Sequence, residues 1–456
     1  MSRPDDRPLG WLGIFRLGLV QAALGAIIVL TTSTLNRVMV VELALPAMLP
    51  GALVALHHLV QVMRPRWGYG SDLGGRRTPW IIGGMAVLAA GGILAALATA
   101  WMQSEATGGT LLAVLAFTLI GMGVGACGTS LLVLLAKRVD ERRRGAAATT
   151  VWLMMILGFI VTAGTAGHFL DPFSTTRLVV VTTAVALIAL AVTVLAIRGI
   201  EGRQPAAGAL ATAGHAPTAP APQPRFRDAL AGVWAEPRAR RFTVFVFVSM
   251  LAYSAQDLIL EPFAGTVFGL TPGESTRLAG VQNAGVLIGM LLLAFLGSSA
   301  WGRRLGTLQT WTIVGCIGST LALFSLAAGG LAGGDFPLRP AVFALGLTNG
   351  LFAVAAIGSM MGLVSAGRGQ REGVRMGLWG AAQAIAFGLG GFLGTAAVDL
   401  TRLLIGEPGP AYALVFAGEG LTFLVAALLA ARVNSVAADS AEVPVLPASA
   451  GLAETA

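Results

Sequence analysis

The sequence predicts an all-α membrane protein whose twelve transmembrane helices form two related bundles of six. Three observations lead to this fold class. Of the 456 residues, 55% are hydrophobic and only 11% are charged, whereas a soluble domain has about 25% charged residues. The apolar residues gather in runs of roughly 20, the length that a helix needs to cross a bilayer. The positive residues concentrate in alternate connections between these runs.

Twelve apolar runs qualify as spans, and one long connection separates them into two sets of six. The expected spans are 14–36, 45–63, 79–102, 111–136, 146–169, 178–197, 242–268, 278–300, 305–330, 340–364, 376–398 and 409–431. We therefore divide the chain into a cytoplasmic N-terminus (1–13), a first bundle (14–199), a cytoplasmic linker (200–241), a second bundle (242–432) and a disordered cytoplasmic tail (433–456).

The long connection has two parts of different composition. Its middle, residues 204–224, is rich in Ala and Pro, which is typical of a disordered linker. In the following stretch, Phe226, Leu230 and Val233 recur at helical spacing among arginines. This second part predicts an amphipathic helix that lies at the membrane interface before the seventh span.

The positive residues predict the orientation of the chain. When successive connections are assigned to alternate sides, the side with both termini holds 25 of the 30 Lys and Arg residues. The opposite side holds only Arg37, Arg177, Arg277, Arg339 and Arg402. Positive residues favour the cytoplasmic side of a membrane, so both termini are expected in the cytoplasm. The same distribution explains the formal net charge of +8 without a nucleic-acid partner.

The connection between the second and third spans carries the motif G-x-x-x-D-x-x-G-R-R, formed by Gly68, Asp72, Gly75, Arg76 and Arg77. The glycines permit a tight turn, the aspartate precedes the positive end of a helix dipole, and the arginines hold the loop in the cytoplasm. The motif resembles the signature loop of the major facilitator superfamily, although Leu73 stands where that family usually has a basic residue. The resemblance implies two pseudo-symmetric six-helix bundles.

Ionisable side chains are costly inside a bilayer, so the few within the spans are functional candidates. We group seven of them, mostly near the outer ends of the spans, as a candidate outer-face polar cluster: Arg37, Glu42, Asp171, Asp257, Glu261, Asp399 and Glu419. Asp257 and Glu261 are four residues apart on one helical face, where Arg37 could pair with a carboxylate. Two interpretations stay open, namely structural ion pairs that close the outer face and residues that contact a ligand or form a gate.

Several chemistries find no support in the sequence. The two cysteines, Cys127 and Cys316, lie in separate apolar runs, so we expect two small buried residues and no disulfide. No metal-binding pattern is found, and no aspartate-rich motif would hold the magnesium and diphosphate of an isoprenoid substrate. We therefore expect a protein that is not an enzyme. The central parts of spans 1 and 4 also lack the ionisable residues of proton-coupled transport.

Three segments resemble the PucC/LhaA family of photosynthetic bacteria, a branch of the major facilitator superfamily. They are residues 35–43 (LNRVMVVEL), residues 377–384 (GLWGAAQA), and residues 412–416 (YALVF) with Glu419. The resemblance extends from about Leu17 to Arg432. This family is tied to the assembly of light-harvesting complexes, and some members carry the name bacteriochlorophyll synthase chain.

The resemblance implies an assembly factor in the intracytoplasmic photosynthetic membrane of a bacterium. Such a factor delivers bacteriochlorophyll to light-harvesting polypeptides or chaperones those polypeptides. Bacteriochlorophyll would be bound transiently, and the implied partners are light-harvesting polypeptides, chlorophyll synthase and membrane lipid. Two alternatives stay open: a transporter of an apolar or weakly polar small molecule, and a subunit of the pigment-synthesising enzyme.

Three histidines are candidates for contact with the pigment: His57, His58 and His168. The first two are adjacent and point about 100° apart on a helix, so one can face the interior and the other a neighbouring helix or lipid. A neutral imidazole can ligate the magnesium of a chlorin while its other nitrogen is held by a hydrogen bond. The alternative is that each histidine is hydrogen-bonded to the backbone or to a neighbouring helix.

Overall fold

The computed structural model describes residues 9–63, 76–140, 143–201, 234–298, 306–365 and 372–433, together with residue 304. Within these residues every regular element is a helix. The helices of the first half are α1 (Trp11–Val29), which continues through η2 (Leu30–Thr34), α2 (Leu35–Arg37) and η3 (Val38–Glu42), then α3 (Met48–Val60) with η4 (Gln61–Met63), α5 (Thr78–Met102), α6 (Ala106–Arg138), α7 (Arg144–Phe169) and α8 (Thr175–Ile197). Those of the second half are α10 (Pro237–Phe268), α11 (Pro272–Ser298), α13 (Leu308–Ala332), α14 (Leu338–Ser365), α15 (Glu372–Ile405) and α16 (Pro408–Val433).

These helices correspond one to one with the twelve expected spans. In the described part of the chain, eleven are long and apolar enough to cross a membrane, and the twelfth, Met48–Met63, is a shorter apolar helix. Several helices extend past the apolar runs that predict them; the first continues to Glu42, and α15 runs from Glu372 to Ile405. Helix ends that leave the hydrocarbon layer can carry polar residues, so hydropathy alone underestimates their length.

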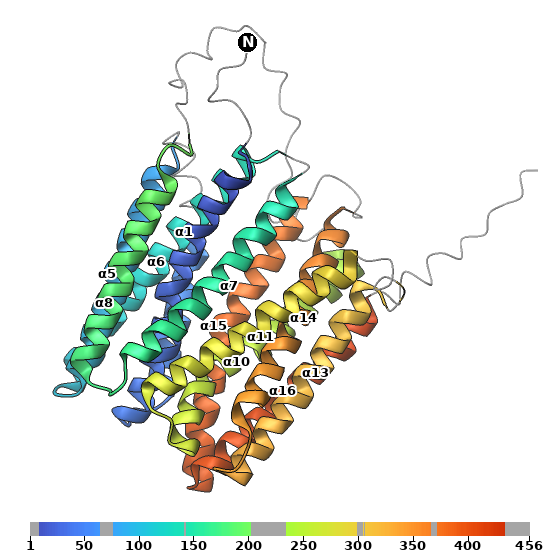
Figure 1. Ribbon diagram of the computed structural model, residues 1–456. Coiled ribbons are helices and arrows are strands. Elements are labelled where there is room, and N and C mark those ends of the chain that lie inside the picture. The colour runs from blue at the N-terminus through green and yellow to red at the C-terminus, as the bar shows by residue number, and fades with distance from the viewer. Residues whose placement is uncertain are drawn as a thin grey trace, which may run out of the picture.

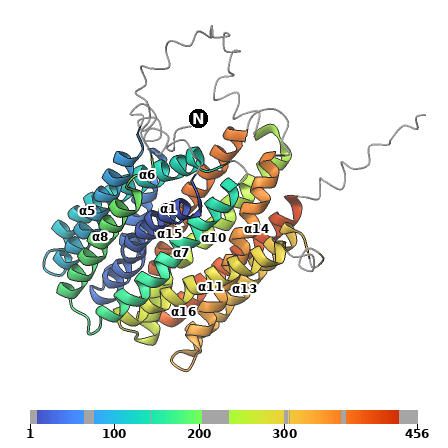
Figure 2. The ribbon, with the colours of Figure 1, turned by 45° about the horizontal axis from the view of Figure 1, so that its top comes forward.

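The two halves form two bundles that meet along a seam (Figures 1 and 2). Each half has its own apolar core. At the seam, α7 packs against α11 and α3 packs against α15. The helices run between two ends of the molecule. We call these the Arg37 end and the Arg77 end, after one residue that lies at each.

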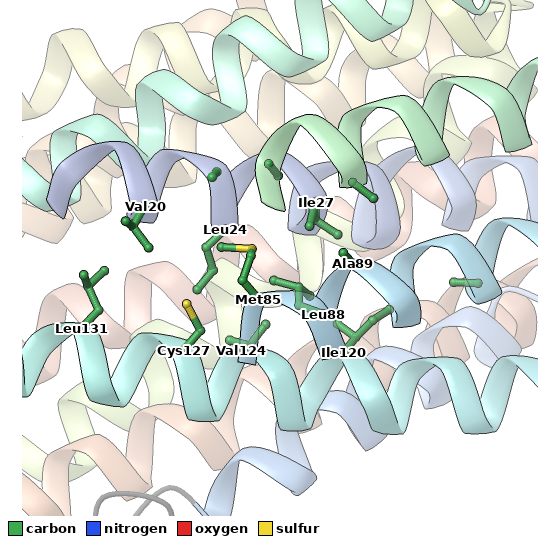
Figure 3. Close-up of a cluster of buried hydrophobic side chains, with 14 of the residues drawn as sticks. Val20, Leu24, Ile27, Met85, Leu88, Ala89, Ile120, Val124, Cys127 and Leu131 are labelled. Carbon is green, nitrogen blue, oxygen red and sulfur yellow. The ribbon is translucent and has the colours of Figure 1, made fainter. Parts of the chain in front are cut away.

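The core of the first bundle shows why small residues are needed between these helices. Figure 3 shows apolar side chains of α1, α5 and α6 meeting in one layer, formed by Val20, Leu24, Ile27, Met85, Leu88, Ala89, Ile120, Val124, Cys127 and Leu131. A Cβ atom at Gly123 would lie 2.5 Å from the backbone nitrogen of Leu88 and 2.7 Å from the carbonyl oxygen of Gly84. The backbones of α5 and α6 therefore touch, as expected where helices associate without a hydrophobic driving force.

Parts of the predicted organisation lie outside the described residues. These parts are the N-terminal stretch up to residue 8, the linker from 202 to 233 with most of its amphipathic segment, and the tail from residue 434. The predicted domain boundaries therefore stay predictions. Both cysteines are buried and free, each within its own half.

Candidate functional site

Arg37 lies at the centre of a polar cluster that joins the halves at the Arg37 end. It ends α2, between the π-helical segments η2 and η3, and π-helical turns are frequent at functional sites. Its side chain is 2% exposed and forms an ion pair with the Glu42 carboxylate. Its Nη2 also donates to the carbonyl oxygen of Leu270 in the second half, at 2.6 Å. The guanidinium therefore connects the end of the first span to the turn after α10.

The guanidinium of Arg37 lies flat over Gly265 of α10. A Cβ atom at Gly265 would lie 2.9 Å from Nη2, 3.0 Å from Nε and 3.1 Å from Cζ of Arg37. These contacts are tighter than a Cβ atom normally makes, so the guanidinium would have to shift if this position carried a side chain.

Glu261 and two threonines add polar contacts beside Arg37. Glu261 is buried, and one of its carboxylate oxygens accepts a hydrogen bond from the Ser33 hydroxyl. Thr34 follows Ser33 in the sequence, and its hydroxyl lies 3.0 Å from the hydroxyl of Thr276. Each contact crosses the seam, and each uses a side chain from η2.

A proline in α10 explains a further bond across the seam. Pro262 has no N–H, so it leaves the carbonyl oxygen of Leu258, four residues earlier, without its helical donor. The side-chain amide of Asn36 donates to that oxygen at 2.5 Å. The first half thus supplies the hydrogen bond that the proline removes.

Two more carboxylates join the halves at the same end. Asp171, after α7, accepts from the Thr271 hydroxyl at 2.8 Å and pairs with Arg277 at 3.0 Å. Asp399 of α15 accepts from the backbone N–H groups of Ala47 and Met48, at 2.9 and 2.7 Å. These N–H groups begin α3, so Asp399 caps a helix of the opposite half.

We call this set of contacts the polar closure; its residues are Ser33, Thr34, Asn36, Arg37, Glu42, Asp171, Glu261, Thr271, Thr276, Arg277 and Asp399. The structure brings Arg37, Glu42 and Glu261 together, and it places Asp171 and Asp399 at separate points of the same closure. Asp257 lies outside it and accepts a long hydrogen bond of 3.4 Å from Gln282.

Glu419 does not belong to the polar closure. It lies in the middle of α16 and is 7% exposed, and neither of its carboxylate oxygens has a hydrogen-bond partner among the described residues. Asp257 of α10 is near enough for an electrostatic repulsion between the two acids. A buried acid without a donor is costly in a bilayer, so Glu419 calls for an explanation of its own.

A groove of about 360 Å³ lies along Glu419, between α10, α15 and α16. These three helices pack against one another. The groove is lined by Leu251, Ala252, Ala255, Gly390, Leu393, Gly394, Ala397, Thr401, Leu414, Val415, Gly418, Glu419 and Thr422. Apart from its chain neighbours and its own helix backbone, no described atom lies within 4 Å of the place where a Cβ at Gly418 would stand, so this glycine borders open space.

The three histidines occupy two different places. His57 is buried, and its Nε2 lies 2.8 Å from the side-chain nitrogen of Gln61. His58 is half-buried, and its ring lies 4.3 Å from that of His57 and 5.6 Å from that of Phe387 on α15. This pair therefore lies at the seam. His168 lies exposed near the end of α7, beside the exposed ring of Phe169.

The signature loop lies mostly outside the described residues, which include Arg76 and Arg77 but not Gly68, Asp72 or Gly75. At its end, Glu201 accepts hydrogen bonds from the backbone N–H groups of Arg77 and Thr78, the latter at 2.8 Å. Burial raises the pKa of Glu201, but a hydrogen bond from the Thr78 side chain, the two backbone hydrogen bonds and the nearby Arg76 charge outweigh it, so the pKa lies below its ordinary value of 4.5. Glu201 thus caps α5 as an anion.

Several residues that make the contacts described above escaped the sequence-based search. Ser33, Thr276 and Gly265 carry no charge, and residues of these types are common in spans. Glu201 stood at the edge of the linker rather than in a span. The proline in the seventh span was a usable signal, because it predicts an unpaired carbonyl four residues earlier.

Comparisons with known proteins place the chain among its relatives. A family model described as "PUCC protein" matches residues 34–438. The chain is 54% identical to "Bacteriochlorophyll synthase 44.5 kDa chain" of Rhodobacter capsulatus, over 96% of this chain and 99% of the relative. It is 30% identical to "Protein PucC" of Cereibacter sphaeroides, over 92% of this chain and 91% of the relative.

Solved structures support the fold. The nucleoside transporter NupG is similar with a TM-score of 0.66 and 13% identity, over 92% of this chain and 99% of that one. A peptide transporter POT in complex with sulfate has a TM-score of 0.66 and 14% identity, over 94% and 97% of the two chains. At such low identity the likeness shows the fold alone, and it confirms the predicted major facilitator architecture. The family model and the relatives together show that this chain belongs to the PucC protein family.

Proposed function

We propose that this protein is a non-catalytic assembly factor of a photosynthetic membrane, which delivers bacteriochlorophyll to light-harvesting polypeptides or chaperones those polypeptides. One observation carries the proposal: the chain is similar over nearly its whole length to proteins named for PucC and for bacteriochlorophyll synthesis. The proposed location is the intracytoplasmic photosynthetic membrane, with both termini in the cytoplasm, as the distribution of Lys and Arg favours.

The acids at the Arg37 end of the molecule have a structural role. The carboxylates of Glu42, Asp171, Glu261 and Asp399 are engaged in the polar closure. These acids hold helices together.

Pigment contact remains part of the proposal, with His57, His58 and His168 as the candidate ligands. His168 is the exposed one of the three. His57 already shares its Nε2 with Gln61. We therefore expect His168→Ala to reduce pigment carried by the protein more than His57→Ala does.

The test is deletion of the gene in a pigmented photosynthetic bacterium, followed by return of the wild-type gene. Near-infrared absorption of the membranes measures the light-harvesting complexes, and purification of the tagged protein in mild detergent measures co-purifying pigment and polypeptides. The expected result is a loss of light-harvesting complexes that the wild-type gene restores, while free bacteriochlorophyll is still made.

Three results would contradict this function. Normal light-harvesting complexes in the deletion strain together with lost uptake or export of a small molecule would show a transporter. Tail attachment to the pigment by the purified chain alone would show an enzyme. Loss of all bacteriochlorophyll, rather than of the complexes, would place the protein in pigment synthesis.

A further inference from the structure

The groove along Glu419 combines an apolar wall with one unsatisfied polar group. The hydroxyls of Thr401 and Thr422, which also line it, donate to carbonyl oxygens of their own helices, at 2.8 Å to Ala397 and 2.9 Å to Gly418. Both carboxyl oxygens of Glu419 are buried, and no described residue donates to them. For an occupant of the groove to satisfy this acceptor, the Glu419 side chain has to turn toward the groove, and the occupant has to bring a hydrogen-bond donor or a positive charge.

The shape of the groove favours a helix as the occupant. On α15 its lining extends from Gly390 to Thr401, which is about 16 Å along the helix axis at 1.5 Å per residue. Small residues form much of its floor, among them Gly418 beside open space, while Leu393 and Leu414 are exposed at its rim. Membrane helices associate through small residues that allow close approach, together with hydrogen bonds between polar side chains. An acyl chain of a lipid fits the apolar wall but brings no donor.

We propose that the groove between α10, α15 and α16 is a docking site for a transmembrane helix of a partner polypeptide, which carries one donor or cationic side chain level with Glu419. This inference rests on the proposed function, because it names the part of the protein that an antenna polypeptide would occupy during assembly. Glu419 gives the site its specificity: an entirely apolar helix would leave the acid unsatisfied, and a helix with an acid at that depth would be repelled.

The test is photo-crosslinking in the native photosynthetic membrane. A benzoylphenylalanine replaces Leu414 at the groove rim, which is 56% exposed, and the matched control carries it at Leu187 of α8, which is 55% exposed. The adduct is digested and the attached peptide is identified by mass spectrometry. The expected adduct at position 414 is a peptide from a transmembrane segment that contains a donor or cationic residue, and the control at position 187 lacks this adduct.

Two variants examine the groove itself in the same experiment. Gly418→Leu fills the groove from a position that borders open space in the described part of the chain, and Gly83→Leu makes the same change at an equally open glycine of α5. Glu419→Leu removes the acceptor. Loss of one hydrogen bond within the bilayer weakens association about tenfold, so we expect about a tenfold fall in adduct for Glu419→Leu, a larger fall for Gly418→Leu, and no change for Gly83→Leu.

The outcomes separate this inference from the proposed function. The docking site is wrong if position 414 attaches only to lipid, only to pigment or to nothing, or if the adduct persists in Gly418→Leu and Glu419→Leu. When that happens while gene deletion still removes the light-harvesting complexes, the proposed function stands and the groove has no part in it. If a helix is captured as expected but deletion leaves the complexes intact, the docking site stands and its partner belongs to another process.

Discussion

The polar closure and the groove along Glu419 differ in whether their acids have hydrogen-bond donors or ion-pair partners within the protein. In the closure, each of the acids Glu42, Asp171, Glu261 and Asp399 accepts at least one hydrogen bond or pairs with an arginine. In the groove, Glu419 is 7% exposed, so it is more buried than each of these acids except Glu261, and among the described residues it has neither. An acid whose donors come from the same chain contributes to the fold, whereas an acid without donors weakens it and is explained by a partner.

This difference predicts opposite responses to mutation. Removing a residue of the closure should lower the stability of the isolated protein, because its former partners remain buried and unpaired. Removing the Glu419 carboxyl should not lower it, because no partner is left behind. The substitutions that follow are arranged from the largest expected change in stability to the smallest.

Arg37→Ala should have the largest effect. It leaves the Glu42 carboxylate and the Leu270 carbonyl without a donor and opens a cavity over Gly265. Breaking a buried ion pair costs about 3–5 kcal/mol; because Glu42 is one-third exposed, we expect about 3 kcal/mol here. The measurement is thermal unfolding in detergent, followed by tryptophan fluorescence. An unchanged Tm would show that the closure does not hold the halves together.

Asp399→Ala should have an intermediate effect. It removes the carboxylate that caps α3 from the opposite half, and loss of a cap costs about 1–2 kcal/mol. Glu201→Ala is the matched control, because it removes a similar cap from α5 within one half. We expect both to lower Tm, but only Asp399→Ala to increase proteolysis or labelling at the seam. Equal labelling in the two variants would argue against a role of Asp399 in joining the halves.

Asn36→Leu should have a smaller effect of about 1 kcal/mol, the value of one hydrogen bond to a buried carbonyl. Its cause can be isolated with Pro262→Ala, which restores a backbone N–H for the Leu258 carbonyl. In the Pro262→Ala background, Asn36→Leu should cost clearly less than in the wild type. Additive losses in this double-mutant cycle would mean that the asparagine does not substitute for the missing helical bond.

The sequence was sufficient for the fold because hydropathy and the placement of arginine depend little on tertiary contacts. The sequence was less informative about which charged side chains pair with one another. Arg37 and Glu42 are five residues apart, which is about 140° around an α-helix, so a pair between them was not expected. The adjacent π-helical turns, with bonds between residues five apart, bring the two onto one face. On the helical face where a carboxylate partner for Arg37 was expected, Glu261 accepts from Ser33 and Asp257 accepts from Gln282.

The groove illustrates a second limit of sequence analysis. Glu419 stood out as an acid inside a span, but its sequence neighbours do not reveal whether a donor lies nearby. That depends on α10 and α15, which are distant in the chain. Gly418 likewise resembles the glycines that allow close packing, and only the structure shows that it borders open space.

The most direct test of this account applies two measurements to one variant, Glu419→Leu. Thermal unfolding of the purified protein reports the internal role of the acid, and near-infrared absorption of the membranes, at matched protein abundance, reports assembly. We predict a Tm equal to or above that of the wild type together with a marked loss of light-harvesting complexes. A lowered Tm, or an unchanged level of complexes, would contradict the claim that Glu419 is reserved for a partner.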